Sequence, residues 1–355
     1  MKEITSTGYN VYFNESAYAA LNDYIANTPP TKIFVLVDEN THAHCYPKFI
    51  TQLVTEATIE IIEIESGEIN KNLETCVGVW NALTDLGADR KSLMINIGGG
   101  VITDMGGFVA SAFKRGIPFI NIPTTLLSMV DASVGGKTGV DLGVLKNQIG
   151  FFSNPEMVLI DSEFLPTVAA REIRSGMAEV LKYGLTYDKK LWEEAKNFKS
   201  LEDKNIDQII YRSIEIKNEV VLEDPKENGL RKILNYGHTL GHAIESYHLE
   251  TAEKENLTHG EAIAIGMITE AYLSAKLFDF PESLLDEIKE KITTIYGKPI
   301  IDKKDYSPII DLLKHDKKNT NGNINFVLLS NLEEFHFNCQ ASEALIIESL
   351  DYYNA

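Results

Sequence analysis

Five short apolar runs in the first half of the chain constrain its fold more than any other feature. Each has the length of a strand, is rich in β-branched residues and is bounded by turn-forming or polar residues; the runs are 33–37, 59–64, 93–97, 119–122 and 157–160. Stretches long enough for a helix separate them. Strands that alternate with helices indicate βαβ units, in which helices cover both faces of a parallel sheet. We therefore expect an α/β domain here.

From about residue 164 the pattern changes to helical spacing with few β-branched runs. Helices are predicted within the segments 169–184, 206–222, 231–248, 260–278 and 282–296, and one late strand at 325–329. A length of 355 residues fits two domains of ordinary size. Pro166 is the best candidate boundary, so we expect a parallel-sheet domain at 1–165 and a mostly α-helical domain at 166–355.

The charge balance restricts the partners. With 33 Lys and Arg against 52 Asp and Glu, the net charge is −19 at pH 7. Nucleic acids and anionic membranes attract basic surfaces, so we expect neither as a partner. A small anionic ligand stays compatible, because a site responds mainly to nearby charges. The scattered cysteines, Cys45, Cys76 and Cys339, indicate reduced thiols, and no apolar run suits a signal peptide or membrane span, so we expect a cytoplasmic protein.

A glycine-rich turn marks a candidate phosphate site. The strand 93–97 leads directly into Gly98–Gly100, after which a helix is expected to begin. Glycines let the backbone approach a diphosphate, and a helix N-terminus offers free N–H groups to it. A tight turn that only packs the helix on the sheet is the alternative. Asp38 ends the first strand. Its carboxylate could accept a hydrogen bond from a ribose hydroxyl, and it is an equally good N-cap for the helix that follows.

A second glycine-rich segment, 131–139, contains Gly-Gly-Lys-Thr, which resembles the end of a phosphate-binding P-loop. The glycine that a complete P-loop requires earlier in the motif is absent, so a nucleotide triphosphatase is a weak interpretation. Lys137 and Lys146 are better explained as contacts to a phosphate or a carboxylate in a glycine-rich loop.

A polar stripe in the second half predicts a site. Arg231, Asn235, His238 and His242 are spaced so that one helix would carry them on one face. Burying such groups without a partner is costly, which implies a polar ligand or a metal, although a solvated or structural histidine pair is the alternative. Spacing alone would pair His238 with His242 as ligands, and would leave His259 as a surface histidine at a helix start.

Together these strings closely resemble the 3-dehydroquinate synthase family. The matching strings are Gly98–Gly100, Pro123–Thr125, Asp131–Lys137, Lys146–Asn147, Gly176–Glu179 with Lys182, Asn235–His242 and His259–Glu261. The resemblance implies a homodimeric shikimate-pathway enzyme with a Rossmann-like NAD⁺ domain, a helical Zn²⁺ (or Co²⁺) domain and the substrate between them. It would convert 3-deoxy-D-arabino-heptulosonate 7-phosphate to 3-dehydroquinate and phosphate by oxidation, phosphate elimination, re-reduction, ring opening and aldol closure. Alternatives are a cyclase of the 2-deoxy-scyllo-inosose synthase type and a dehydrogenase of the glycerol dehydrogenase type.

The resemblance also assigns residues. Glu179, His238 and His259 would bind the metal, which replaces the pairing of His238 with His242. The residues expected at NAD⁺ are Asp38, Asn40, Ser66, Gly67, Glu68, Lys71, Gly99, Gly100, Val101, Ile102, Thr103, Asp104, Thr124, Thr125, Lys137, Lys146, Phe164 and Thr167. Those expected at the substrate are Arg115 from the neighbouring subunit, Asp131, Lys137, Lys146, Asn147, Lys182, Lys217, Arg231, Asn235, His242 and Lys317. Thr103 departs from the glycine that many relatives have.

Overall fold

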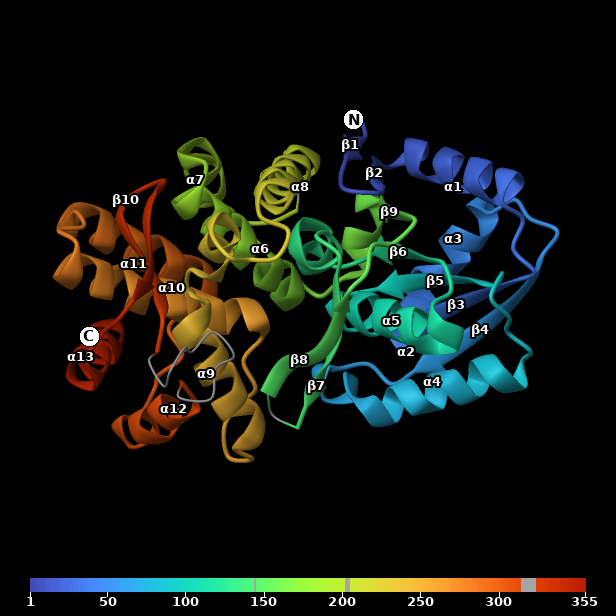
Figure 1. Cartoon of the computed structure of the whole chain (residues 1–355). Helices are drawn as coiled ribbons and strands as arrows, with labels where there is room; N and C mark the ends of the chain where they lie inside the picture. The colour runs from blue at the N-terminus through green and yellow to red at the C-terminus, as the bar shows by residue number, and fades with distance from the viewer. Residues whose placement is uncertain (144, 202–204, 314–323) are drawn as a thin grey trace. The chain divides into compact units, whose positions relative to one another are not determined.

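The structure, a computed structural model, describes residues 1–143, 145–201, 205–313 and 324–355. Contacts divide these residues into two compact units (Figure 1): residues 1–169 with 206–222, and residues 170–205 with 223–355. The predicted boundary at 165/166 lies shortly before the observed division. For residues 206–222 the prediction and the structure differ more. The sequence placed these residues in the second domain, whereas their helix packs with the first unit. Asn218 there donates a 2.9 Å hydrogen bond to the carbonyl of Thr5.

The first unit is built on a seven-stranded sheet within the described residues. Its strands in spatial order are β1 (Ile4–Thr5), β2 (Asn10–Phe13), β9 (Met157–Ile160), β6 (Phe119–Pro123), β5 (Leu93–Gly98), β3 (Lys32–Asp38) and β4 (Thr58–Ile64). Every neighbouring pair is parallel except β1 and β2. The predicted parallel sheet is confirmed. The two N-terminal strands were not predicted, because their short segments carry no long apolar run.

Helices cover this sheet (Figure 1). They are α1 (Glu15–Asn27), α2 (Glu39–His44), α3 (Tyr46–Gln52), α4 (Leu73–Asp85), α5 (Gly100–Ala112) and α8 (Ile206–Glu223). All six residues of β5 are buried, which explains why its sequence is apolar except at Asn96 rather than alternating. Met94, Met105 and Val109 belong to one buried cluster that joins α5 to the sheet.

The order of the strands creates a switch point between β3 and β5. The chain leaves β3 for β4 on one side and then returns to pair β5 with the other side of β3. In open α/β sheets, ligands bind beyond the carboxyl ends of the strands at such a point. Asp38 ends β3 and Gly98 ends β5, so both predicted nucleotide-binding segments lie at this edge.

The glycine-rich segment after residue 136 is a hairpin, not the loop that we predicted. Strand β7 (Lys137–Leu142) pairs antiparallel with β8 (Leu145–Phe152), and Gly139 faces Gly150. A Cβ atom on Gly150 would lie 2.0 Å from the carbonyl oxygen of Thr138. The glycines therefore allow close strand pairing here, whereas their number in the sequence suggested a flexible turn.

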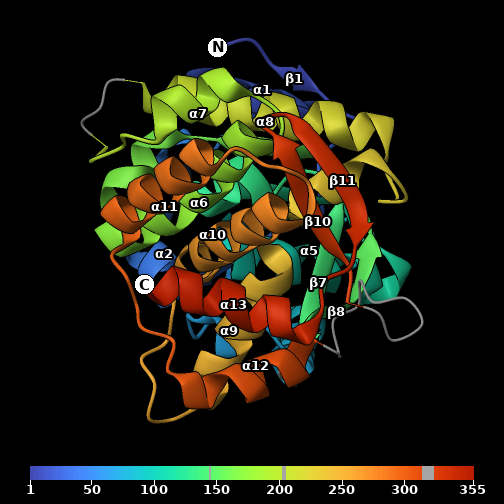
Figure 2. The ribbon, with the colours of Figure 1, turned by 90° about the vertical axis from the view of Figure 1, so that its left-hand side faces the viewer.

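The second unit is mostly helical, as predicted (Figure 2). It contains α6 (Ala170–Thr186), α7 (Lys189–Ala195), α9 (His238–Glu250), α10 (His259–Leu277), α11 (Glu282–Tyr296), α12 (Tyr306–Leu313) and α13 (Glu343–Asn354). The buried helix α10 packs against α6, α9, α11 and α13. The expected late strand is β10 (Phe326–Asn331), and it pairs with a strand we did not predict, β11 (Glu334–Cys339). Among the described helices, none has both the length and the apolar character needed to cross a bilayer.

The predicted helix at 231–248 is wrong, because the chain breaks in its middle. Leu230–Asn235 forms a 3₁₀ turn, and α9 begins only at His238. Between them Gly237 adopts φ +79°, and a Cβ there would lie 2.7 Å from Cγ of Met267. This glycine brings α9 against α10, so the polar residues of the stripe lie on two elements instead of one helix face.

Candidate active site

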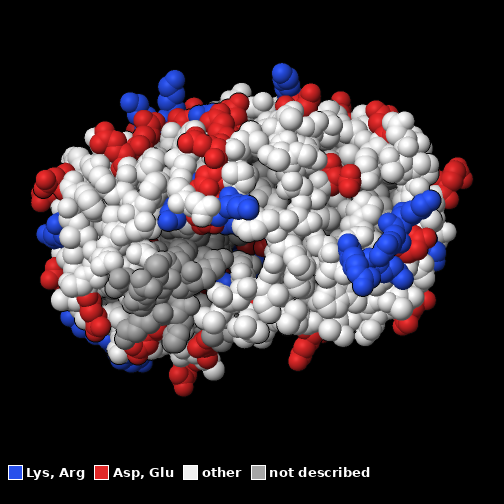
Figure 3. Space-filling model, in the orientation of Figure 1, with Lys and Arg blue, Asp and Glu red and all other residues white. Residues whose placement is uncertain are grey.

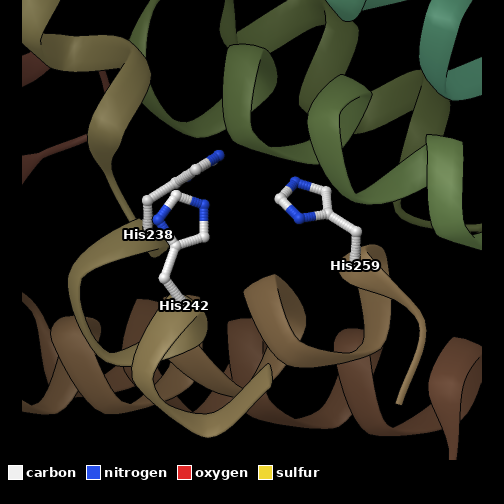
Figure 4. Close-up of side chains that lie close together, drawn as sticks. All are labelled: His238, His242 and His259. Atoms are coloured by element: carbon white, nitrogen blue, oxygen red, sulfur yellow. The ribbon is translucent and has the colours of Figure 1, made fainter. Parts of the chain in front are cut away.

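Four polar side chains of the second unit come together around the start of α9. Glu179 lies on α6, His238 and His242 lie on α9, and His259 is the first residue of α10. The three imidazoles face one another (Figure 4), and each offers one ligand atom within 4.8 Å of the others. Their ring centroids are 5.1 to 5.7 Å apart. His259, an isolated helix-start histidine in the sequence, thus joins the other two.

Glu179 faces two of these histidines. Its Oε1 lies 3.3 Å from Nε2 of His238 and 3.3 Å from Nε2 of His259, while Oε2 accepts a hydrogen bond from Lys182. Burial by itself would raise the pKa of the Glu179 carboxyl. The nearby Lys182 and His238 outweigh burial and hold that pKa well below its usual range. Glu179 is therefore a buried anion beside two imidazoles.

The other nitrogen of each of these two imidazoles has its own acceptor. Nδ1 of His238 donates to the carbonyl of Tyr236 at 3.0 Å, and Nδ1 of His259 donates to Oε2 of Glu245 at 3.2 Å. Such bonds hold a proton on Nδ1, so that Nε2, which faces Glu179, is the nitrogen that would bind a metal, with release of any proton it carries. Burial lowers the pKa of His238. Burial acts in the same direction on His259, but the carboxylates of Glu245 and Glu179 outweigh it and raise its pKa to about 10.

Buried contacts place the helix that carries His238 and His242. The carboxylate of Glu270, on α10, accepts hydrogen bonds from the backbone N–H groups of Gly237 at 2.7 Å and Thr239 at 3.1 Å. Because Gly237 has no side chain, Glu270 takes the part of an N-cap from a neighbouring helix. Glu270 and Glu245 were not predicted, since both lie far along the chain from the groups they contact.

The donor set fits a tetrahedral Zn²⁺ or Co²⁺ ion. Two imidazole nitrogens and a carboxylate oxygen with one further position form a common catalytic zinc site. Two ligand atoms of a tetrahedral Zn²⁺ with bonds of about 2.0–2.1 Å lie about 3.3–3.4 Å apart. The distances from Glu179 Oε1 to the two Nε2 atoms, 3.3 Å each, match that edge.

Arg231 and Asn235, the first members of the predicted stripe, lie in the 3₁₀ turn before α9. Arg231 donates through Nη1 to the carbonyl of Pro225 at 2.9 Å, and Asn235 donates through Nδ2 to Oε1 of Glu227 at 2.5 Å. Glu227 was not predicted, and no pattern in the sequence distinguishes it from other surface acids. Both predicted residues therefore belong to a polar segment that leads into the histidine cluster.

In the first unit, the predicted nucleotide residues gather at the sheet edge. Gly99 caps α5, and a Cβ on it would lie 3.2 Å from Cγ2 of Thr125. Asp38 accepts from the backbone N–H of Thr41 at 2.7 Å, so its N-cap role is real. Other predicted residues at this edge are Gly100, Val101, Ile102, Thr103 and Asp104 in the first turns of α5, and Thr124 after β6. This edge offers N–H groups and a carboxylate beside the switch point.

A charged network connects another part of the predicted set. Lys71 Nζ lies 2.6 Å from Asp104 Oδ2 and 2.7 Å from Asn147 Oδ1, and Lys146 Nζ lies 2.9 Å from Glu68 Oε1. Burial opposes the charge of Lys71, but nearby carboxylates, Asp104 first, raise its pKa. Lys146, predicted as a contact to an anion, is thus paired with an acid in this structure.

The remaining predicted residues are distributed more widely. Lys217 Nζ lies 2.9 Å from Asp131 Oδ1, which joins α8 to the segment before β7. Phe164 is buried, and its carbonyl accepts from the Thr167 hydroxyl. Ser66 contacts Glu39, while Asn40, Gly67, Arg115 and Lys137 are exposed. Lys317 lies outside the described residues.

Known families match most of the chain. The pattern of the 3-dehydroquinate synthase N-terminal region matches residues 61–175, and that of the C-terminal region matches residues 176–319. A 3-dehydroquinate synthase of Parabacteroides distasonis is 41 % identical over 94 % of this chain and 94 % of its own length. One of Clostridium botulinum is 42 % identical over 85 % of this chain and 86 % of its own length. The predicted family is confirmed.

Solved structures give the same fold. A 2-deoxy-scyllo-inosose synthase complexed with carbaglucose-6-phosphate, NAD⁺ and Co²⁺ has a TM-score of 0.83, with 28 % identity and coverage of 99 % of both chains. A glycerol dehydrogenase from Schizosaccharomyces pombe has a TM-score of 0.62 at 14 % identity over 97 % of this chain and 88 % of its own, so it shares the fold alone. The higher identity to the curated relatives favours the main prediction over both alternatives.

Proposed function

Because the chain belongs to the 3-dehydroquinate synthase family, we propose that it converts 3-deoxy-D-arabino-heptulosonate 7-phosphate to 3-dehydroquinate and phosphate. In this role it is a carbon–oxygen lyase that uses NAD⁺ and one Zn²⁺ or Co²⁺ ion. The first unit binds NAD⁺, and the second supplies the metal and much of the substrate site.

The observation that carries the proposal is the contact of one buried carboxylate with two imidazoles. Glu179, His238 and His259 are the metal ligands, and the two equal distances of 3.3 Å support this set. His242 belongs to the same cluster and is assigned to the substrate. Lys182, 1 % exposed and bonded to the other oxygen of Glu179, keeps that carboxylate ionised and turned toward the histidines.

The sheet edge supplies the nucleotide site. The N-terminus of α5 and the glycines before it bind the pyrophosphate of NAD⁺, and Asp38 accepts from a ribose hydroxyl. When bound, NAD⁺ takes up and returns a hydride, and the metal ion polarises the substrate oxygen at the oxidised carbon. The Cβ that Gly99 lacks would lie 3.2 Å from Thr125, so this glycine also packs the turn against the segment after β6.

The substrate carries a carboxylate and a phosphate, so its site requires several cations. The residues assigned to it are Arg115, Asp131, Lys137, Lys146, Asn147, Lys182, Lys217, Arg231, Asn235, His242 and Lys317. Lys146 and Lys217 each have a carboxylate within 2.9 Å, so an arriving anion competes with Glu68 and Asp131 for them. The cations orient the anion, and charge-assisted hydrogen bonds of this kind are the strong ones.

We further propose a homodimer, with Arg115 reaching the neighbouring subunit, and a cytoplasmic location. Arg115 lies in an exposed turn, where its backbone adopts φ +70° and that of Lys114 adopts +49°. Such conformations are unfavourable for side chains of this size unless the segment has a specific contact to make. The cysteines Cys45, Cys76 and Cys339 are free thiols, as a reducing compartment would leave them.

Release of inorganic phosphate tests the activity. Purified protein incubated with the heptulosonate phosphate is expected to release phosphate only with NAD⁺, to lose this activity in a chelator and to regain it with Zn²⁺ or Co²⁺. Glucose 6-phosphate in the same assay tests the 2-deoxy-scyllo-inosose alternative. Free NADH would accumulate with a simple dehydrogenase, whereas here its absorbance should not rise. Phosphate release from glucose 6-phosphate but not from the heptulosonate phosphate would contradict the proposal, and so would net formation of NADH.

A further inference from the structure

His259 has a second acidic partner that the proposed ligand set does not include. Its Nδ1 lies 3.2 Å from Oε2 of Glu245, while its Nε2 lies 3.3 Å from Oε1 of Glu179. Glu245 lies on α9 and is 8 % exposed. The imidazole therefore stands between two buried carboxylates, one at each ring nitrogen.

The position of His259 in the chain makes such a partner necessary. It is the first residue of α10 and follows the connection 251–258, so the helix fixes its backbone from one side only. Contacts around it hold the backbone: Thr258 and Glu261 form a capping box, and the N–H of Gly260 donates to Ser175. None of them restrains the ring. Glu245 contacts the ring directly, from another helix.

The chemistry of imidazole gives this contact a consequence. A neutral imidazole that offers one nitrogen to a metal carries its proton on the other, and an acceptor at that proton selects the tautomer and the ring orientation. His238 has the Tyr236 carbonyl as this acceptor, at 3.0 Å. Glu245 is an acidic counterpart for His259, and a carboxylate binds an N–H more strongly than a carbonyl does.

We propose that Glu245 is a positioning residue, which keeps His259 in its Nδ1–H form and directs Nε2 toward Glu179. This inference rests on the metal site of the proposed function and adds a residue outside its ligand set. Glu245 contacts the ring of His259 and is not one of the three assigned ligands. Its effect is on how tightly the metal is held.

Zn²⁺ affinity of the full-length protein tests the role, measured by competition with a chromophoric chelator after metal removal. Glu245→Ala is expected to weaken Zn²⁺ binding about 10–100-fold, the range typical of outer-shell partners of zinc histidines. Glu245→Gln should lose less, because its amide oxygen still accepts from Nδ1–H. Glu250→Ala serves as the control, since Glu250 is an exposed acid at the end of the same helix, and it should bind Zn²⁺ as the unmodified protein does.

Nitrogen NMR of the Zn²⁺-loaded protein gives a readout that a loss of stability alone would not change. The His259 ring should show Nδ1–H in the unmodified protein and in Glu245→Gln, and lose that single form in Glu245→Ala. Unchanged affinity and tautomer in Glu245→Ala would overturn the role of Glu245 alone. If Glu245→Ala does not fold, Glu245→Gln is compared with Glu250→Gln. Zn²⁺ affinity equal to that control in a Glu245→Gln protein whose His259 ring lacks the Nδ1 proton would overturn the role. An unmodified chain that binds no Zn²⁺ would overturn the metal site together with this inference.

Discussion

Glu179 has no exposed surface, and its interactions with Lys182 and two histidines hold its pKa below the usual range. A carboxylate without those partners would be protonated or excluded from such a place. We expect Glu179→Ala to lose bound metal and to reduce phosphate release by more than about 100-fold, beyond the effect of outer-shell partners. Metal content of the purified variant and its turnover measure this.

Two further variants make that result interpretable. Glu179→Ala leaves Lys182 buried without its carboxylate, which can cost about 3–5 kcal/mol of stability. Glu179→Gln keeps the side-chain shape and should also lose metal, so a folding defect can be told from a ligand defect. Glu194→Ala, at an exposed acid on α7, should retain both metal and turnover. A folded Glu179 variant that kept its metal and its turnover would refute the ligand assignment.

Asp305 gives a prediction on pH. It has no exposed surface and accepts hydrogen bonds from Lys254 at 2.6 Å and Tyr247 at 2.7 Å. Burial raises its pKa, but these partners outweigh burial and lower it. Because the pKa of Asp305 is lower in the folded state, its ionised carboxylate stabilises the fold fully above the unfolded pKa of about 3.9. This stabilisation is lost as pH falls through the lower pKa of the folded state.

We therefore expect Asp305→Asn to lower the free energy of unfolding by about 1–3 kcal/mol at neutral pH, and by less in acid. Urea unfolding at a series of pH values measures the difference. Asp302→Asn is the matched control, since Asp302 bonds the same lysine from a side chain that is 51 % exposed, and it should cost at most about 1 kcal/mol. If the free energy of unfolding lost in Asp305→Asn grew on acidification, the proposed role of the ionised carboxylate would be contradicted.

Single residues also show where sequence reasoning stops. The resemblance assigned Glu179, His238 and His259, which the structure places in contact. Glu245 and Glu270 escaped notice, because an acid that bonds a ring or a helix N-terminus across a helix pair leaves no periodic signal. Spacing paired His238 with His242, and these rings are indeed neighbours, 5.1 Å apart, but spacing says nothing of a carboxylate on another helix.

At the scale of elements, the five strand-length apolar runs were the most informative signals. Strands β3, β4, β5, β6 and β9 coincide with the five predicted runs. Four of them, β3, β5, β6 and β9, are buried on both faces and therefore mostly apolar. The edge strand β4 is more exposed and carries Glu60 and Glu63, but its four isoleucines still marked it as a strand. The predicted helix 231–248 failed, since polar spacing continued across a break that only Gly237 marks. The hairpin β7–β8 was missed because glycines in paired strands look the same in sequence as glycines in a loop.

Gly237 allows a direct test of how α9 is set against α10. Gly237→Ala puts a Cβ at φ +79° and 2.7 Å from Met267. A left-handed conformation costs about 1–2 kcal/mol for such a residue, and overpacking about 1–3 more. We expect urea unfolding to show the sum of these losses, and metal binding to weaken because His238 starts the helix.

The matched control is another glycine-to-alanine change in the same protein. Gly78 lies within α4, has an ordinary φ and would have nothing within 4 Å of a new Cβ. Gly78→Ala should stabilise the protein by about 0.4–1 kcal/mol, since alanine favours a helix and restricts the unfolded chain. Equal effects of the two substitutions would show that the close approach at Gly237 has no energetic importance.

For the whole molecule, the acidic composition and an anionic substrate have to be reconciled. On the face drawn in Figure 3, acidic side chains lie in many places, with a concentration toward the upper left, and the largest group of basic side chains lies at the right. Dispersed acids keep a protein soluble and repel polyanions, while a few cations placed together can still bind a small anion. Net charge led us to expect no nucleic acid or membrane as a partner, but it could not predict that Lys146, Lys182 and Lys217 each have a carboxylate partner of their own.

The proposed homodimer gives a prediction that a single chain cannot satisfy. If Arg115 completes the neighbour's substrate site, Arg115→Ala and Glu179→Ala homodimers should both be inactive, for different reasons. A hybrid dimer made by co-expressing the two variants with different affinity tags would contain one complete site. In that site Glu179 comes from the Arg115→Ala chain and Arg115 from the Glu179→Ala chain.

Because a symmetric dimer has two equivalent sites, the isolated hybrid should recover about half of the unmodified turnover per dimer. Phosphate release measures it. Pairing Glu179→Ala with Lys137→Ala provides the control, since both residues are assigned to the site of their own chain. That hybrid should stay inactive, because each of its two sites then lacks a residue. An Arg115 hybrid as inactive as its parents would place Arg115 within its own subunit's site or outside catalysis altogether.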